Sequence, residues 1–123
     1  MKTLVVDDSA TMRKIVINIL VGAGHSEVDQ AADGQQALDA IKAAAYDLVL
    51  MDWNMPNMLG IDALKAIRAS GNSVPVIMVT TEAEKSRVLE ALKAGANNYI
   101  IKPFKPEMIV GKIQETLSRS STP

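Results

Sequence analysis

Four short runs of apolar residues, none of them alternating with polar residues, recur along this chain. They occupy residues 4–6, 48–51, 76–79 and 99–101. Continuous apolar runs of this length are typical of strands that are buried on both faces, as in a parallel sheet covered by helices. A fifth run, at residues 27–31, carries a single valine, which indicates a strand at the edge of that sheet.

Segments with helical spacing separate these runs. Their apolar residues recur every three or four positions, so each segment presents one stripe for burial. Strand and helix alternate five times, which with right-handed crossovers predicts an α/β fold, a (βα)5 doubly wound sandwich with helices on both faces. The stripes are Met12, Ile15, Val16, Ile19 and Leu20; Leu38 and Ile41; Ile61, Leu64 and Ile67; Val88, Leu89 and Leu92; and Ile109, Ile113 and Leu117.

Length and composition narrow the class of protein. The 123 residues fit one domain, which we place at residues 1–119, with a polar tail at residues 120–123 and no output domain after it. The polar character begins at Ser118, from where we expect a frayed end. Lys and Arg number 13 against 14 Asp and Glu, so the chain lacks the basic field that binds nucleic acid. No run approaches the roughly 20 apolar residues that span a bilayer, and cysteine is absent, so we expect a cytoplasmic protein.

Residues able to bind a metal and a phosphate end several of the apolar runs. Ligands of an open α/β sheet bind beyond the carboxyl ends of its strands, and there the chain places Asp7, Asp8, Asp52, Thr80 and Lys102. Crowded carboxylates repel, so at neutral pH they take up a proton or bind a cation. Oxygen ligands without sulfur or imidazole favour Mg²⁺ over zinc or copper. Lys102 and Thr80 would then contact a phosphoryl group bound at the same edge.

Each of these residues also has an ordinary structural explanation. Asp7 and Asp8 could end a strand and cap the next helix, and Asp52 could be a loop aspartate before a turn. A lysine before proline, such as Lys102, is commonly solvated. The functional interpretation depends on their conjunction at four strand ends.

Five segments of the chain match motifs of one protein family. They are an acidic pair, a phosphoacceptor segment, a glycine that opens a helix, a hydroxyl position and an aromatic-plus-lysine segment. Here these read Leu4-Val5-Val6-Asp7-Asp8-Ser9, Leu50-Met51-Asp52-Trp53-Asn54-Met55-Pro56, Gly60, Val79-Thr80 and Tyr99-Ile100-Ile101-Lys102-Pro103-Phe104. Together they resemble the receiver domains of two-component response regulators, and with Thr11-Met12-Arg13 they are especially similar to the chemotaxis members. The resemblance implies a flavodoxin-like sheet with the strand order 2-1-3-4-5.

The resemblance also implies a role for each matching acidic residue. Asp52 is the phosphoacceptor, a nucleophile that takes a phosphoryl group from a phosphohistidine on a sensor kinase. Asp8 and Asp52 coordinate Mg²⁺ together with the backbone carbonyl of Asn54, and Asp7 helps through water.

The remaining matching residues are implied to stabilise and transmit the phosphorylated state. Lys102 and Thr80 contact the phosphoryl group. Thr80 and Tyr99 form a switch, because the hydroxyl is drawn inward and the aromatic ring follows, which shifts the population between two packings. Asn54 and Glu82 flank the path of a hydrolytic water and tune dephosphorylation.

The implied partners are proteins. A sensor histidine kinase or a histidine phosphotransfer domain supplies the phosphoryl group. A downstream protein target, for which the flagellar motor switch is a candidate, binds according to phosphorylation. The chain is expected to be a monomer that binds neither nucleic acid nor membrane. It is not expected to be an enzyme, and its own chemistry is limited to self-phosphorylation from small donors and self-dephosphorylation.

Other functions are open at this stage. A single-domain phosphorelay intermediate, which hands its phosphoryl group to a histidine phosphotransfer protein, has the same motifs. A haloacid dehalogenase-type phosphatase needs an aspartate two residues after the nucleophile, where this chain has Asn54. A flavodoxin needs a hydroxyl-rich phosphate loop where Asp7 and Asp8 stand. A phosphate-independent docking module would not need the acidic residues.

Two further expectations concern apolar residues. The periodicity of residues 12–20 places Ile17 and Val21 on the outward side of a helix, beside Arg13 and Lys14, which suggests a docking face for a helical partner. Trp53 is expected to be a loop aromatic near the metal.

Overall fold

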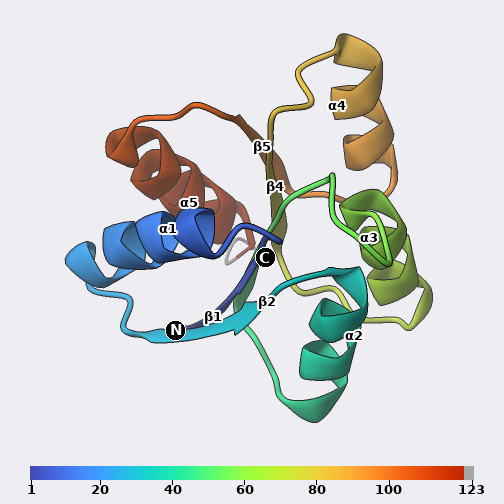
Figure 1. Ribbon diagram of the computed structural model, residues 1–123, viewed down its shortest axis with the longest axis horizontal. Coiled ribbons are helices and arrows are strands. Elements are labelled where there is room, and N and C mark those ends of the chain that lie inside the picture. Colours follow the sequence, from blue (N-terminus) through green and yellow to red (C-terminus); the bar gives the residue numbers. More distant parts are fainter. Residues whose placement is uncertain (121–123) are drawn as a thin grey trace.

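The computed structural model describes residues 1–120, in which five parallel strands form one sheet of order β2-β1-β3-β4-β5. The predicted doubly wound α/β sandwich and its strand order are therefore confirmed. Helices α1 and α5 lie on one side of the sheet, and α2, α3 and α4 lie on the other (Figure 1). The elements are β1 (Lys2–Val6), α1 (Ala10–Gly22), β2 (Glu27–Ala31), α2 (Gly34–Ala43), β3 (Leu48–Met51), α3 (Gly60–Ala69), β4 (Val76–Thr80), α4 (Lys85–Lys93), β5 (Asn98–Ile101) and α5 (Pro106–Ser120).

Three of the four uninterrupted apolar runs form the central strands, as predicted. The fourth lies in β5, which like β2 is an edge strand and is buried only in part, with Ile101 46% exposed. Every residue of β3 and β4 is buried, as is β1 after Lys2, whereas β2 is mostly exposed and lies at the edge. Successive side chains point to opposite faces, so each strand feeds two cores. Leu4 and Met51 pack on the side of α2 and α3, and Val5 and Leu50 pack on the side of α1 and α5.

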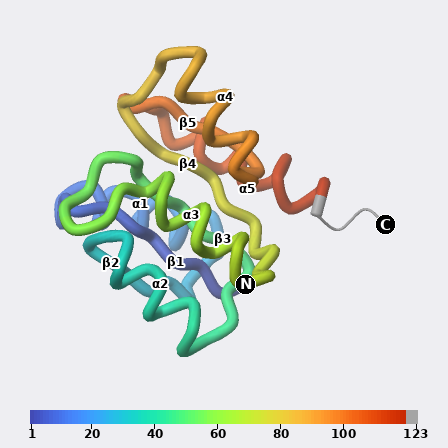
Figure 2. The backbone as a smooth tube through the Cα atoms, turned by 90° about the vertical axis from the view of Figure 1, so that its right-hand side faces the viewer, coloured from blue at the N-terminus to red at the C-terminus, as the bar shows by residue number. Residues whose placement is uncertain are grey.

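The helices differ in how firmly their first turns are fixed. Ser9 caps α1 by accepting from the backbone N–H of Met12, and Asp33 caps α2 by accepting from that of Gln36. Glu84, at the start of α4, makes no side-chain capping bond. Among the residues of α4, all of which the structure describes, Ala91 alone is buried. The stripe predicted for this helix was therefore wrong in part, because Leu89 and Leu92 are 44% and 45% exposed. Helix α4 lies at the β5 end of the sheet, away from α2 (Figure 2).

The expected orientation of the first helix was wrong in part. Ile15, placed in the buried stripe, is 44% exposed, whereas Ile17, placed on the outward face, packs against the core formed with α5. The neighbouring helix α5 contacts α1 and shifts the buried face toward itself. Of the proposed docking face, only Val21 is an exposed apolar side chain, so the face as predicted is not present.

The C-terminal helix is longer than expected. Residues 118 and 119, where a frayed end was predicted, belong to α5, which continues to residue 120. The division into a domain at residues 1–119 and a tail at residues 120–123 stays a prediction, because residues 121–123 lie outside the described part. Within residues 1–120, no helix is both long and apolar enough to cross a membrane.

Candidate functional site

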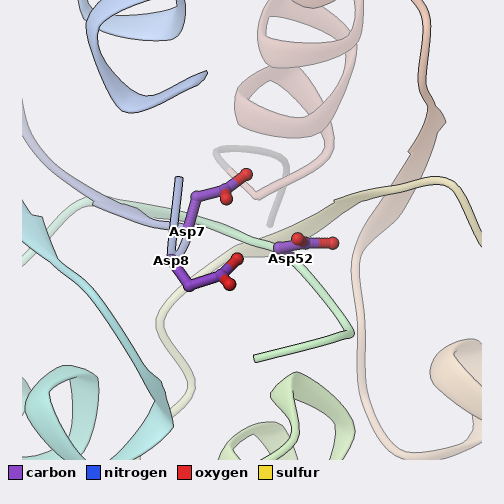
Figure 3. A group of neighbouring side chains, drawn as sticks. All are labelled: Asp7, Asp8 and Asp52. Atoms are coloured by element: carbon purple, nitrogen blue, oxygen red, sulfur yellow. The ribbon is translucent and has the colours of Figure 1, made fainter. Parts of the chain in front are cut away.

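The predicted acidic residues converge at the carboxyl end of the sheet. Asp7 and Asp8 follow β1 and Asp52 follows β3, its neighbour in the sheet. One carboxylate oxygen of each residue lies within 4.8 Å of the corresponding oxygens of the other two. Figure 3 shows the three carboxyl groups gathered where the two strands end.

The cluster fits an oxygen-seeking divalent cation. Asp7 and Asp52 are buried and Asp8 is exposed, so the group opens to solvent on one side. Its donor atoms are carboxylate oxygens alone, which suit Mg²⁺ and disfavour zinc or copper. Three carboxylates beside one ammonium, that of Lys102, leave two negative charges in excess, which is the charge that a divalent cation neutralises.

Lys102, directly after β5, reaches across the sheet end to both buried aspartates. Its Nζ lies 2.7 Å from Oδ2 of Asp7 and 3.4 Å from Oδ2 of Asp52. The lysine side chain is only 12% exposed, so these charges interact with little screening by water. The sequence predicted Lys102 beside the acceptor, but not its shorter contact with Asp7.

The Asp52 carboxyl is held in a partly desolvated setting. Burial raises the pKa of Asp52 above its usual value, and the negative charge of Asp7 raises it further. Lys102, the backbone N–H of Trp53 and the Thr80 hydroxyl oppose this shift. The Trp53 N–H donates to Oδ1 of Asp52 at 2.7 Å, so one carboxylate oxygen is fixed by the backbone.

A glycine brings the start of α3 against the backbone of the acceptor. A Cβ at Gly60 would lie 1.8 Å from the carbonyl oxygen of Asp52, so no other residue fits without displacement. The Gly60 N–H donates to the carbonyl of Trp53 at 2.8 Å and closes the loop between β3 and α3. This requirement explains the glycine that the motif comparison singled out.

The residues assigned to switching and dephosphorylation lie together beside this site. The amide nitrogen of Asn54 donates to Oε1 of Glu82 at 3.1 Å. The Tyr99 hydroxyl donates to the backbone carbonyl of Glu82 at 2.5 Å, and the Glu82 N–H donates to Oγ1 of Thr80 at 3.3 Å. Burial raises the pKa of Tyr99 to about 12, with the charges of Glu82 and Asp52 adding to the shift. Thr80 and Tyr99 are thus linked through one residue, Glu82.

Some contacts of the site were not predicted. Arg13 of α1 donates to the backbone carbonyl of Asp7 at 2.6 Å and to Oε1 of Gln30 at 2.9 Å, so it braces the acidic pair against the edge strand. Trp53 lies in the loop between β3 and α3, as expected, but its side chain is only 3% exposed and packs in the core, which the sequence did not predict. The guanidinium of Arg87 lies 5.6 Å from the centre of the Trp53 ring. This contact joins α4 to the loop between β3 and α3, which we call the acceptor loop because it begins at Asp52.

Comparison with known proteins identifies the family. A sequence profile described as the response regulator receiver domain matches residues 3–114. The chain belongs to this family. Receiver domains of the CheY type act as signalling switches and bind Mg²⁺ at an acidic pocket, and in this receiver domain Asp7, Asp8 and Asp52 form such a pocket.

Curated relatives of this receiver domain include chemotaxis proteins. A chemotaxis protein CheY homolog of Campylobacter jejuni is 46% identical over 124 residues, covering 98% of this chain and 95% of the relative. The chemotaxis protein CheY1 of Helicobacter pylori is 48% identical over 120 residues, covering 95% of this chain and 97% of the relative. The predicted similarity to chemotaxis response regulators is therefore confirmed.

Solved structures agree with this assignment. The chemotaxis response regulator CheY4 of Vibrio cholerae has a TM-score of 0.87 and 38% sequence identity, covering 94% of this chain and 97% of that one. A two-component response regulator from Clostridium difficile has a TM-score of 0.91 at 26% identity, covering 99% of both chains. This receiver domain therefore has the CheY-like flavodoxin fold.

Proposed function

We propose that this chain is a response regulator that accepts a phosphoryl group on Asp52 from the phosphohistidine of a sensor kinase. The observation that carries the proposal is the convergence of Asp7, Asp8, Asp52 and Lys102 on one sheet edge. A carboxylate oxygen of Asp52 attacks phosphorus, the P–N bond breaks, and its electron pair returns to the imidazole.

The surrounding residues favour this transfer through position and charge. Asp7, Asp8, Asp52 and the backbone carbonyl of Asn54 would hold Mg²⁺, which when bound neutralises charge on phosphoryl oxygens. Lys102 lies 3.4 Å from Oδ2 of Asp52, close enough to contact a group attached to that carboxylate.

The phosphorylated state is read through Thr80 and Tyr99. A phosphoryl group on Asp52 offers acceptors to the Thr80 hydroxyl, which now faces the carboxyl group and the Glu82 N–H. A change at Thr80 alters the Glu82 backbone that holds the Tyr99 hydroxyl, so the two packings of Tyr99 are populated according to phosphorylation.

Tyr99 also lines a surface suited to a downstream partner. A hollow of about 630 Å³ lies along β5 and the start of α5, where Tyr99 and Phe104 meet the exposed side chains of Ile101 and Met108. The chemotaxis names of the Campylobacter and Helicobacter relatives favour a flagellar motor switch protein as the target. The alternative is a histidine phosphotransfer protein that takes the phosphoryl group onward.

The lifetime of the phosphorylated state is set in part by Asn54 and Glu82. Their hydrogen bond, 3.1 Å long, joins the residue two after Asp52 to the residue two after Thr80, and in this proposal the two side chains flank the path of a hydrolytic water. We expect self-dephosphorylation, which requires no other catalyst, and self-phosphorylation from small donors such as acetyl phosphate. A phosphoryl group that persists unchanged for hours in Mg²⁺ buffer would contradict this.

The experiment that tests the phosphoacceptor is labelling with radioactive acetyl phosphate. Wild type should incorporate acid-stable, base-labile phosphate in Mg²⁺, whereas Asp52→Asn, or wild type in EDTA, should incorporate none. Asp62→Asn, which alters an exposed aspartate in the first turn of α3, is the matched control and should label as wild type does. Equal labelling of Asp52→Asn and wild type would refute the proposal.

The partner is tested by affinity capture from lysate with and without beryllofluoride and Mg²⁺. Recovery of a flagellar motor component that depends on beryllofluoride supports the chemotaxis function. Recovery of a phosphotransfer protein instead supports the phosphorelay function.

A further inference from the structure

The loop between β3 and α3 has an unusual backbone conformation at its tip. Asn57 has a φ of 68° and is the one non-glycine residue within residues 1–120 with a positive φ. This left-handed conformation is disfavoured for side chains with a Cβ and is tolerated best by asparagine and aspartate. Contacts from outside the loop are therefore needed to keep it in one conformation.

One such contact comes from the start of α2. The side-chain amide of Asn57 donates to Oδ2 of Asp33 at 2.7 Å, and Oδ1 of Asp33 accepts from the backbone N–H of Gln36 at 2.8 Å. Asp33 is buried, and both of its oxygens are thus used. Its position as the cap of α2 is fixed independently of the loop that it holds.

Close packing joins the same two loops beside this hydrogen bond. A Cβ at Gly34 would lie 2.9 Å from both the Cβ and the carbonyl oxygen of Met58, the residue after Asn57. Figure 1 shows the loop before α3 lying against the start of α2. The loop between β3 and α3 is therefore held at its tip by Asp33 and Gly34, and at its junction with α3 by the close approach of Gly60 to Asp52.

We infer that Asp33 and Asn57 are positioning residues that hold the acceptor loop in the conformation that binds a divalent cation. The inference rests on the proposed function in that it takes Mg²⁺ to be held by Asp52 and the backbone carbonyl of Asn54. Neither Asp33 nor Asn57 contacts the cation; they keep the segment between those ligands and Gly60 from relaxing when the cation is absent.

Two substitutions separate an effect on Mg²⁺ binding from a general loss of folding stability. Asn57→Gly keeps a residue that adopts positive φ freely but loses the amide. Asp33→Ser keeps a good helix cap for α2 but loses the second oxygen. Each should weaken Mg²⁺ binding about tenfold, as substitutions of groups that orient metal ligands do, and the double variant should be no weaker than either single one.

An exchange of the two groups gives a rescue test. Asn57→Asp alone sets two carboxylates against each other and should weaken Mg²⁺ binding, although its added charge would by itself attract the cation. Asp33→Asn combined with Asn57→Asp keeps the net charge of wild type and restores a donor opposite an acceptor. This pair should bind Mg²⁺ within about twofold of wild type, because the contact is rebuilt in reverse.

Mg²⁺ binding is measured by fluorescence titration of Trp53, the one tryptophan of the chain. Folding of each variant is checked by urea unfolding without Mg²⁺, and Asp39→Ser, an exposed position on α2, serves as control. The labelling rate at saturating Mg²⁺ should stay within about twofold of wild type, because the acceptor itself is intact.

The outcomes distinguish this inference from the proposed function. A wild type whose Trp53 fluorescence and unfolding are both unaffected by Mg²⁺ overturns the cation site, and the inference with it. A wild type that binds Mg²⁺, together with Asn57→Gly and Asp33→Ser variants that bind it equally well, overturns the inference alone. Failure of the exchanged pair to recover affinity also overturns it.

Discussion

Substitution of Gly60 by alanine tests how tightly the acceptor loop is packed. The added methyl group would lie 1.8 Å from the carbonyl oxygen of Asp52, 2.9 Å from its carbonyl carbon and 3.1 Å from the Cα of Trp53. All three are backbone atoms, so no flexible side chain can move aside. Either the first turn of α3 or the end of β3 must shift.

The size of the effect follows from this geometry. Real Cβ atoms do not approach other atoms closer than 3.0 Å, so the gap must widen by at least about 1.2 Å in a core that deforms little. Overpacking costs about 1–3 kcal/mol, and contact with backbone alone places Gly60→Ala near 3 kcal/mol. For a domain of this size that lowers Tm by roughly 10 °C.

Gly111 provides the matched control. It lies within α5, and a Cβ there would meet nothing within 4 Å. Gly111→Ala should therefore raise the free energy of unfolding by about 1 kcal/mol, since alanine favours the helix. Both variants are measured by urea unfolding at neutral pH with EDTA present.

Phosphorylation gives a second readout of the same substitution. The displaced atoms belong to Asp52 and Trp53, so Gly60→Ala should also label poorly from acetyl phosphate, whereas Gly111→Ala labels normally. A Gly60→Ala protein as stable as wild type would refute the reasoning from the close approach. So would two alanine variants that change stability in the same direction.

Three other predictions use different groups. Burial raises the pKa of Tyr46 and of Tyr99 to about 12, so the native protein at about pH 10.5 should lack tyrosinate absorbance. Its free energy of unfolding should fall as the pH rises from about 10 to about 12, because the unfolded chain ionises first. Half-ionisation of the tyrosines near pH 10 in the folded protein would contradict this. Mg²⁺ at 100 times its Kd should stabilise wild type by about 2.7 kcal/mol in thermal unfolding, and Asp8→Asn should lose most of that gain; equal gains would argue against the site. Arg87→Gln should cost about 0.5–1 kcal/mol and change the emission of Trp53, and unchanged emission would show that the contact across 5.6 Å is not maintained.

The layers of the fold were predictable, because buried parallel strands leave uninterrupted apolar runs. The strand order came from the resemblance to receiver domains, since apolar runs do not say which strands are neighbours. The face of α1 was not predictable. Periodicity gives the angle between side chains on a helix but not which neighbouring element covers them. Ile17 is covered by the core beside α5, and Ile15 is left in solvent, for reasons that lie in another part of the chain.

The site was predictable where it depends on strand ends and hidden where it depends on loops. Asp7, Asp52 and Lys102 follow strands whose register fixes where they meet. The pairing of Asp33 with Asn57 joins two loops 24 residues apart, and its only sign in the sequence is an aspartate that reads as a helix cap. A residue that caps one helix and also holds a distant loop therefore leaves no sequence pattern that distinguishes it from an ordinary helix cap.

Helix α4 contributes one buried side chain, Ala91, to the core. The rest of its sequence is therefore under weak folding constraints, and substitutions on it should change the free energy of unfolding by about 1 kcal/mol or less. Its exposed residues, among them Leu89 and Leu92, can diverge between related proteins while the acidic pocket stays the same. Substitutions on the outer surface of α4 can therefore change what this helix binds while the core and the acidic pocket keep their shape.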